Sequence, residues 1–301
     1  MTELSEIRKV STERIVTKTG EKLPEPKVTL DSPIGMFDSG LGGLSVLQIL
    51  MKELPNEGVI YFADTARVPY GGRPPQEIVK INYEIIDYLI EQGIKLLVMA
   101  CGTSSSIAYP VVKEKYKLPI VEIVTPGARA AVKATGTGRI GLIATVGTVD
   151  SGAFQREIKA IRADAEVFAQ GCPLFVPLIE GGFIGAEETK RVAREYLKPI
   201  LKEKIDTLIL GCTHYPFLSK IIQEIAGPGV VLVNPGEEAV SEAKELLKKN
   251  DLLHSGKRSG SNTYLVSGSL SQFKEMGSRL MGKPLSGVHK VNLVAKKGPI
   301  R

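Results

Sequence analysis

Cysteine and long apolar runs are both scarce in this chain of 301 residues. Only Cys101, Cys172 and Cys212 occur, an odd number at wide spacing, so no framework of disulfides is expected. No run approaches the roughly 18 to 20 apolar residues of a membrane span. The first thirty residues carry mixed charges where a signal peptide would have an apolar stretch. These absences predict a soluble protein of the reducing cytoplasm that has no membrane partner.

Charge of one sign is also in short supply. The 39 Lys and Arg residues exceed the 33 Asp and Glu residues by only six, spread over the whole chain. So small an excess is a weak indication of a nucleic-acid partner, and it is equally expected of an enzyme with an anionic substrate. We therefore expect no nucleic-acid partner. At roughly 100 to 200 residues per domain, the length predicts about two domains.

Short apolar runs alternate with longer stretches of helical period. This alternation is typical of a parallel sheet covered by helices, so the predicted fold class is α/β and doubly wound. The expected strands are 34–37, 59–63, 96–100, 120–124, 140–144, 166–169, 207–210, 230–233 and 263–267. The expected helices include 45–52, 76–92, 127–133, 154–161, 187–203, 218–224 and 237–249.

Two stretches recur at nearly the same spacing. Ile34-Gly-Met-Phe and Ile140-Gly-Leu-Ile, 106 residues apart, each precede a turn of small residues. Leu97-Val-Met-Ala-Cys and Leu208-Ile-Leu-Gly-Cys, 111 residues apart, each end on a cysteine. The repeat indicates two duplicated halves, although coincidence between two generic buried strands gives the same pattern. We expect two pseudo-symmetric parallel-sheet domains with the active site in the cleft between them.

The expected domains are not continuous in sequence. We predict a polar N-terminal arm over 1–30, a first α/β domain from 31–122 plus 234–301, and a second from 123–233. Pro126 and Pro235 each follow a strand and mark the expected crossings between the halves. Residues 254–262 are predicted to form an exposed loop.

The glycine-rich turn at 38–43 raises the possibility of phosphate binding. Ligands of doubly wound folds bind outside the carboxyl ends of the strands, where this turn lies, and glycines let backbone N–H groups approach an anion. A dinucleotide fingerprint is incomplete, because Gly40 and Gly42 lack the third glycine; Asp64, 22 residues past Gly42, would be its ribose-binding acid. The alternative is a tight turn that binds any small anion, including a carboxylate.

The cysteines are more informative. Cys101 and Cys212 each follow a strand and precede small hydroxyl residues, so each is expected at a helix N-terminus, which lowers the pKa of a thiol. Cys172 precedes a proline and lacks this setting. A thiol pair in one cleft could serve redox chemistry, a metal, or acid and base chemistry on opposite faces of a substrate. The spacing disfavours a metal site or a redox pair, because neither Cys-x-x-Cys nor His-x-x-x-His occurs around these thiols.

An opposed acid and base is what inversion of a carbon centre needs. One thiolate removes the Cα proton and the facing thiol delivers another. Asp38 and His214 are the candidates to tune the two thiols. The alternatives are a helix cap for Asp38 and a structural role for His214.

Several strings resemble the glutamate racemases of the aspartate/glutamate racemase superfamily. They are Asp38-Ser-Gly-Leu-Gly-Gly, Tyr61-Phe-Ala-Asp-Thr-Ala-Arg-Val-Pro-Tyr-Gly, Ala100-Cys, Cys172-Pro-Leu-Phe-Val-Pro-Leu-Ile-Glu and Gly211-Cys-Thr-His-Tyr-Pro. The resemblance runs from about residue 33 to about residue 293. It implies racemisation of L- and D-glutamate without a cofactor or a metal, supplying D-glutamate for peptidoglycan, by a homodimer.

The resemblance also implies the site. The implied catalytic residues are Cys101, Cys212, Asp38, His214 and Glu180, and the alternative for Glu180 is a salt bridge in a loop. The implied substrate-binding residues are Asp38, Ser39, Pro69, Tyr70, Gly71, Gly102, Thr103, Thr213 and His214.

Two positions depart from the family pattern. Gly102 stands where the family usually has an asparagine, and loss of a side-chain amide that bonds a charged substrate would cost about 1.5–3 kcal/mol. This leaves open a binding protein or a weakly active homologue, besides a racemase or isomerase for aspartate or a related acid. Gly268-Ser269 replaces a usual Gly-Asp pair, and no consequence is assigned to it.

Overall fold

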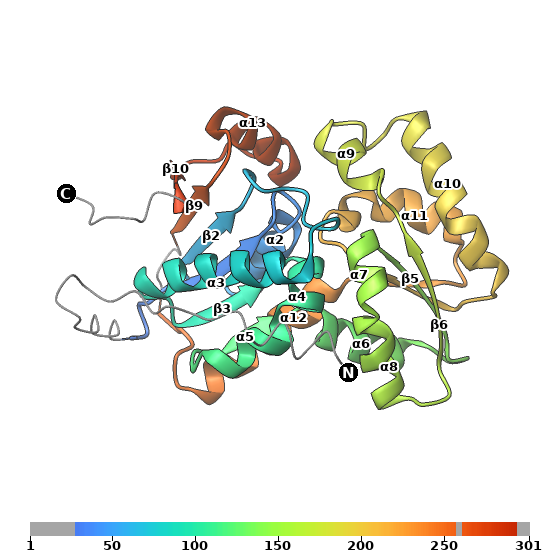
Figure 1. Cartoon of the computed structure of the whole chain (residues 1–301), viewed down its shortest axis with the longest axis horizontal. Helices are drawn as coiled ribbons and strands as arrows, with labels where there is room; N and C mark the ends of the chain where they lie inside the picture. Colours follow the sequence, from blue (N-terminus) through green and yellow to red (C-terminus); the bar gives the residue numbers. More distant parts are fainter. Residues whose placement is uncertain (1–27, 257–260, 294–301) are drawn as a thin grey trace.

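The computed structural model describes residues 28–256 and 261–293, which form two lobes side by side (Figure 1). Most of the predicted N-terminal arm, residues 1–27, lies outside the described residues, as do residues 257–260 of the predicted loop. Within the described part of the chain, no helix is long and apolar enough to cross a membrane.

The first lobe contains a six-stranded parallel sheet in the order β10-β9-β2-β1-β3-β4. Its strands are β1 (Ile34–Asp38), β2 (Val59–Ala63), β3 (Leu96–Met99), β4 (Ile120–Glu122), β9 (Asn262–Val266) and β10 (Val288–Lys290). Its helices are α2 (Leu44–Glu53), α3 (Pro75–Glu91), α4 (Gly102–Ile107), α5 (Tyr109–Lys115), α12 (Pro235–Lys249) and α13 (Leu270–Met281). The central strands β1 and β3 are wholly buried, as expected of a sheet covered on both faces.

The second lobe contains a four-stranded parallel sheet in the order β6-β5-β7-β8. Its strands are β5 (Arg139–Ala144), β6 (Glu166–Gly171), β7 (Thr207–Leu210) and β8 (Val231–Val233). Its helices are α6 (Val124–Ala134), α7 (Val146–Ser151), α8 (Ala153–Ile161), α9 (Phe175–Glu180), α10 (Glu187–Lys202) and α11 (Ser219–Ala226), with a 3₁₀ turn η1 (Tyr215–Leu218) before the last.

The two sheets share one topology. In the first, the strands run second, first, third and fourth in chain order (β2-β1-β3-β4), and the second sheet repeats this arrangement (β6-β5-β7-β8). The repeated sequences fall on equivalent strands, β1 with β5 and β3 with β7. The predicted α/β fold with two pseudo-symmetric parallel sheets is confirmed. Strands β9 and β10 are additions at one edge of the first sheet.

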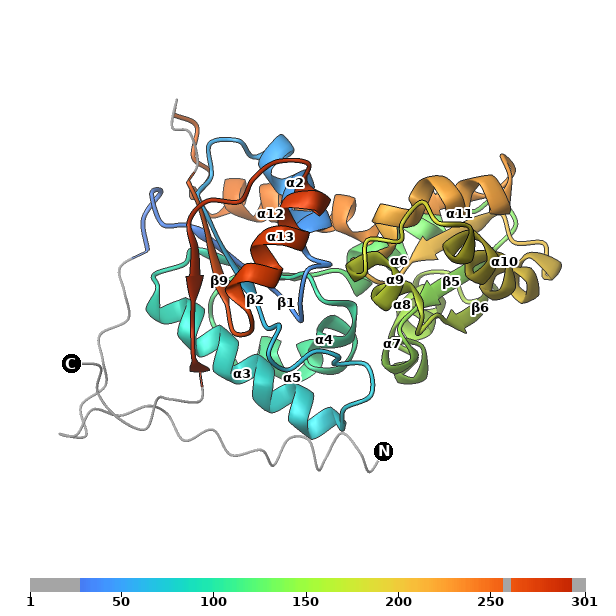
Figure 2. The same ribbon diagram turned by 90° about the horizontal axis from the view of Figure 1, so that it is seen from above.

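Two helices carry the chain between the lobes. Helix α6, which contains Pro126, lies between β4 and β5, and α12, which begins at Pro235, lies between β8 and β9. The two helices pack so closely that a Cβ added at Gly127 of α6 would lie only 2.8 Å from the Pro235 Cβ of α12. Figure 2 shows α6 and α12 where the two lobes meet. The division of the chain at residues 30, 122 and 233 stays a prediction.

The elements differ from expectation at several places, among them β4 and α13. Strand β4 ends at Glu122, not at residue 124, because the Glu122 carboxylate accepts the backbone N–H groups of Val124 and Thr125 and so starts α6. Helix α13 was not expected. The Ser269 hydroxyl accepts the N–H of Gln272 at its first turn, which is the capping role that an aspartate performs equally well.

A buried ion pair joins distant segments of the first lobe. The Nζ of Lys95, wholly buried, lies 2.6 Å from the Glu57 Oε2 and donates to the carbonyls of Leu30 and Leu252 at 2.7 and 2.9 Å. The Glu57 Oε1 accepts the backbone N–H of His254 at 2.8 Å. The pair therefore connects the start of β3 and the turn before β2 to two other segments of the chain, one at Leu30 and one at residues 252–254.

Candidate active site

The predicted site residues follow the carboxyl ends of three central strands. Asp38 ends β1, Cys101 follows β3 by two residues, and Cys212 follows β7 by two residues. This is the end of a doubly wound sheet at which ligands bind. All three side chains are almost fully buried.

Cys101 precedes the first turn of α4. Its Sγ lies 3.7 Å from the Ser39 Oγ. Burial and the charge of Asp38 raise the pKa of the Cys101 thiol to about 11, against hydrogen bonds from Ser104 and Ser39 that favour the thiolate. The prediction of a lowered pKa is therefore wrong for this thiol. Helix α4 has only six residues, and its N-terminus does not outweigh the desolvation of the sulfur.

Cys212 belongs to a chain of three polar side chains. Its Sγ lies 3.8 Å from the His214 Nδ1, and the His214 Nε2 lies 2.9 Å from the Glu180 Oε1. Burial lowers the pKa of His214, but the hydrogen bonds and charges of Cys212 and Glu180 outweigh it and raise the pKa to about 10. At neutral pH the imidazolium can donate one N–H to the sulfur and the other to the carboxylate.

Asp38 joins the two lobes. Its Oδ1 accepts the N–H of Gly40 at 2.8 Å, and its Oδ2 accepts the Thr213 hydroxyl at 3.0 Å. The Thr213 carbonyl in turn accepts the Ser45 hydroxyl at 2.7 Å. Asp38 therefore raises the pKa of the first thiol and also contacts Thr213, the residue after the second thiol. The contact with Thr213 was not expected from the sequence.

The glycine turn accommodates the second lobe. A Cβ at Gly42 would lie 2.3 Å from the His214 Nδ1 and 2.5 Å from the Thr213 Oγ1, so only glycine fits there. Asp64, the residue that a dinucleotide site would use to bind the ribose, is wholly buried. Its carboxylate accepts hydrogen bonds from the hydroxyls of Tyr70 and Ser267 at 2.5 and 2.7 Å. The turn and Asp64 therefore both have structural partners, which removes support for a dinucleotide site.

The lobes also meet beside the first thiol. A Cβ at Gly102 would lie only 2.5 Å from the carbonyl oxygen of Gly211, the residue before Cys212. The Thr103 Oγ1 lies 3.1 Å from the Thr145 Oγ1. The segments that hold the two cysteines thus face each other across the interface between the lobes.

Of the remaining predicted binding residues, Gly71 lies at the same interface. Pro69 is exposed, and Tyr70 is buried with its hydroxyl on Asp64. A Cβ at Gly147 would lie 2.8 Å from the Gly71 carbonyl oxygen. Thr145 and Gly147 were missed as site residues, although the repeat places them in the second lobe's counterpart of the glycine turn.

Cys172 has the contacts of a packed residue. Its Sγ lies 3.6 Å from the carbonyl oxygen of Gln170, and its own carbonyl accepts the Tyr215 hydroxyl at 3.0 Å. Burial, together with the charge of Cys212, raises the pKa of its thiol. In the described part of the chain, no group of three or more His, Cys, Asp or Glu side chains is arranged to hold a metal ion.

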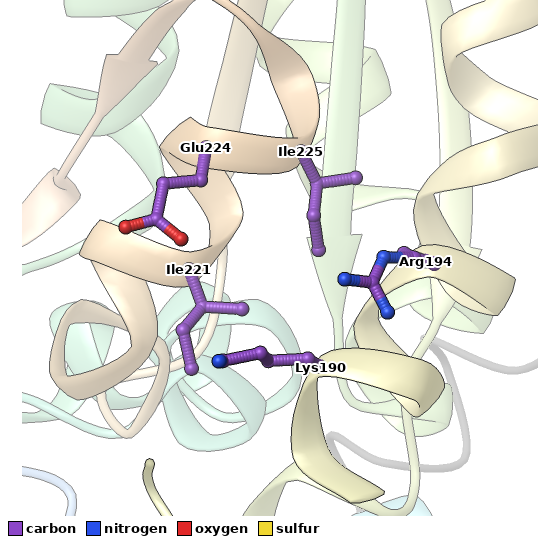
Figure 3. Close-up of a pocket in the computed structure, with 5 residues that line it drawn as sticks. All are labelled: Lys190, Arg194, Ile221, Glu224 and Ile225. Atoms are coloured by element: carbon purple, nitrogen blue, oxygen red, sulfur yellow. The ribbon is translucent and has the colours of Figure 1, made fainter. Parts of the chain in front are cut away.

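A pocket of about 330 Å³ lies elsewhere, between α10 and α11. Figure 3 shows Lys190 and Arg194 of α10 facing Ile221, Glu224 and Ile225 of α11. None of these residues belongs to the predicted site, and none offers a thiol. The pocket therefore has no part in the chemistry considered for the two cysteines.

Comparison with known proteins shows which family the chain resembles. The model of the Asp/Glu/Hydantoin racemase family matches residues 43–243. A glutamate racemase of Geobacter metallireducens is 43% identical over 264 residues, which are 88% of this chain and 98% of that protein. The crystal structure of a glutamate racemase isoform from Bacillus anthracis superposes with a TM-score of 0.85 at 33% identity, covering 88% of this chain and 99% of that one. A structure from Francisella tularensis in complex with D-glutamate gives a TM-score of 0.83 at 34% identity, with 88% and 99% covered.

The fold and the family match define the class of protein: the chain belongs to the Asp/Glu/Hydantoin racemase family. Within that family, the relatives and structures named above place this racemase among the glutamate racemases. The resemblance carried by its motifs is thereby confirmed.

Proposed function

We propose that this enzyme interconverts L- and D-glutamate without a cofactor, using Cys101 and Cys212 on opposite faces of the substrate Cα. The observation that carries the proposal is the placement of the two thiols. They follow equivalent strands of the pseudo-symmetric sheets, and the residues next to them, Gly102 and Gly211, touch across the interface. A substrate held between the lobes has one thiol on each side.

The proposed reaction moves one proton in each half. A thiolate on one side takes the Cα proton, the bond electrons remain on the substrate as a carbanion, and the thiol on the other side donates its proton to the opposite face. The substrate is inverted, and the two sulfurs have exchanged protonation states. Activity is therefore expected to fall at both extremes of pH, where both sulfurs are protonated or both are ionised.

The two thiols have different partners for these roles. Cys101 has a thiol pKa of about 11 beside Asp38, and so holds its proton at neutral pH. Cys212 faces the His214 cation, which Glu180 holds from its other nitrogen. We assign Asp38 to the first thiol, and His214 with Glu180 to the second. In the resting enzyme Cys101 is then the acid, and Cys212 is the sulfur that faces the His214 ring.

Glutamate is the proposed substrate because the relatives at this identity are glutamate racemases and the Francisella tularensis structure contains D-glutamate. Hydroxyls and backbone N–H groups at Ser39, Thr103 and Thr213, with the loop from Pro69 to Gly71, are proposed to hold it. We further propose a role in supplying D-glutamate for peptidoglycan, a homodimeric assembly and a cytoplasmic location, where the thiols stay reduced.

Solvent deuterium exchange tests the activity directly. Incubation with either enantiomer of glutamate in D₂O is expected to place deuterium at Cα and to bring both to an equal mixture, followed by proton NMR and polarimetry. Aspartate serves as the matched control and is expected to react far more slowly. Faster exchange with aspartate would overturn the choice of substrate. Glutamate binding in calorimetry without any exchange would overturn the enzyme in favour of a binding protein.

Gly102 gives a second test, because two opposite results are possible. Restoring the family's asparagine (Gly102→Asn) would raise activity if the missing amide were the limiting defect. The structure predicts the reverse, since the Cβ would lie 2.5 Å from a backbone oxygen of Gly211 and force the lobes apart. Misplacement of reacting groups by about 1 Å costs on the order of 100-fold in rate, and we expect a fall of that size in kcat.

The control for this substitution is Gly72→Ala. Nothing lies within 4 Å of a Cβ built at Gly72, which is two residues from the buried Tyr70 and on the same loop. It is expected to leave kcat and KM near the wild-type values. A Gly102→Asn variant faster than wild type would contradict the steric account and support the lost-amide account.

A further inference from the structure

Ser45 connects the first lobe to the segment that holds the second thiol. It is buried in the first turn of α2, and its hydroxyl donates to the Thr213 carbonyl at 2.7 Å. The two residues are 168 positions apart in the sequence and belong to different lobes. This carbonyl is part of the peptide that joins Thr213 to His214, so the bond holds the backbone from which the imidazole projects.

The turn that contains Thr213 lacks a donor of its own for this carbonyl. The Cys212 carbonyl accepts the N–H of Tyr215, three residues ahead, at 3.0 Å. The His214 carbonyl likewise accepts the N–H three residues ahead of it, at 3.1 Å. The same spacing would pair the Thr213 carbonyl with Pro216, which has no N–H. The hydroxyl of Ser45 therefore supplies from the first lobe the donor that this turn cannot provide.

Two further contacts with the first lobe involve the same segment. The Thr213 hydroxyl donates to the Asp38 Oδ2 at 3.0 Å. A Cβ added at Gly42 would collide with the His214 ring, and the Gly42 carbonyl accepts the N–H of Ser45 at 3.0 Å. The turn before α2 therefore leaves space for the imidazole at Gly42, while α2 holds the adjoining peptide through Ser45.

We propose that Ser45 is a positioning residue for the second thiol: its hydroxyl holds the Thr213 carbonyl and thereby keeps the imidazole of His214 in place. This inference deepens the proposed two-thiol function and rests on it. The contact that depends on Ser45 is the one of 3.8 Å between the His214 Nδ1 and the Cys212 Sγ. Cys101 belongs to the same lobe as Ser45, so the position of the first thiol does not depend on this bond.

The test measures each thiol separately. In Cys101→Ser, deuterium exchange into the one reactive enantiomer of glutamate reports on Cys212, and in Cys212→Ser it reports on Cys101. Adding Ser45→Ala is expected to slow exchange by Cys212 about tenfold, the factor that corresponds to one hydrogen bond, and to leave exchange by Cys101 near its starting rate. A side chain that only stabilised the interface between the lobes would affect both reactions alike.

Ser151→Ala is the matched control. The Ser151 hydroxyl donates to the Thr148 carbonyl at 2.7 Å, which is the same bond at the same length but within one lobe, so neither exchange rate should change. Ser45→Thr keeps the hydroxyl and is expected to preserve exchange by Cys212. Circular dichroism and the melting temperature identify a variant that fails to fold. Ser45→Cys, whose thiol is a weaker donor, replaces Ser45→Ala if that variant does.

A titration of His214 gives a readout that does not depend on catalysis. Burial lowers the pKa of His214, but the hydrogen bonds and charges of Cys212 and Glu180 raise it to about 10. In the otherwise wild-type enzyme, Ser45→Ala is expected to lower this pKa by about one pH unit, because the ring is held less closely to these two partners. Nitrogen-15 NMR of the imidazole measures the change.

The possible results distinguish the positioning role from the proposed function. Equal slowing of the two exchange reactions, unchanged exchange by Cys212, or an unchanged pKa of His214 in folded Ser45→Ala overturns the proposal. If neither single-thiol variant exchanges glutamate before Ser45 is replaced, the proposed function is overturned. A lowered pKa of His214 in Ser45→Ala then still upholds the positioning role.

Discussion

Replacing either Cys101 or Cys212 by serine is expected to lower the rate of racemisation about 10³-fold while preserving proton exchange in one enantiomer only. A serine hydroxyl is a much weaker acid than a thiol, so the altered side neither removes nor delivers a proton. Loss of a general acid or base lowers the rate by about 10²–10⁴-fold, and we expect about 10³-fold for each variant. The remaining thiol still removes the Cα proton from the enantiomer whose proton faces it and returns it to the same face.

The two variants are therefore expected to exchange opposite enantiomers. Deuterium incorporation into L- and D-glutamate, measured separately by NMR, checks this for each enzyme. Cys172→Ser is the matched control, since Cys172 is buried and bonds a backbone carbonyl, and it should keep racemisation near the wild-type rate. If Cys212→Ser still racemised glutamate, or if both variants exchanged the same enantiomer, the assignment of one thiol to each face would be wrong.

Replacing Lys95 by methionine is expected to lower the free energy of unfolding by about 3–5 kcal/mol. The substitution leaves the buried Glu57 carboxylate without its cation, 2.6 Å from where the Nζ had been, and leaves two backbone carbonyls without a donor. Breaking one side of a buried ion pair is strongly destabilising, because the remaining charge stays in a medium that solvates it poorly. Urea unfolding followed by circular dichroism measures the change.

A comparison with an exposed ion pair separates burial from charge. Arg191 of α10 bonds Glu188 and Glu195 on the surface, and Arg191→Met is expected to leave the free energy of unfolding close to the wild-type value. The double variant Glu57→Met, Lys95→Met should recover part of the loss, because no unpaired charge remains. A Lys95→Met protein as stable as the Arg191→Met protein would show that the buried pair contributes little.

Much of the site was predictable from short stretches of sequence. The strand endings at Cys101 and Cys212 are visible because each cysteine follows a run of apolar residues or glycine and has a threonine within the next two positions. The carboxyl ends of parallel strands lie at the same edge of a sheet, so local patterns already place Asp38 near Cys101. The repeat then relates Cys101 to Cys212.

Other features could not be predicted, because they depend on contacts between the lobes. Gly42 has the spacing of a phosphate-binding glycine, yet a Cβ there would meet His214. The pKa of Cys101 was expected to fall, but burial and Asp38 raise it.

The sequence by itself determined the fold class, the two related halves and the identities of the candidate acids and bases, because each follows from periodicity, strand endings and residue chemistry within a few positions. Only the tertiary structure decided how closely the halves approach at Gly102 and Gly211, and whether the pKa of Cys101 rises or falls. These properties depend on distance and desolvation between residues far apart in the chain, and neither quantity is written in a local pattern.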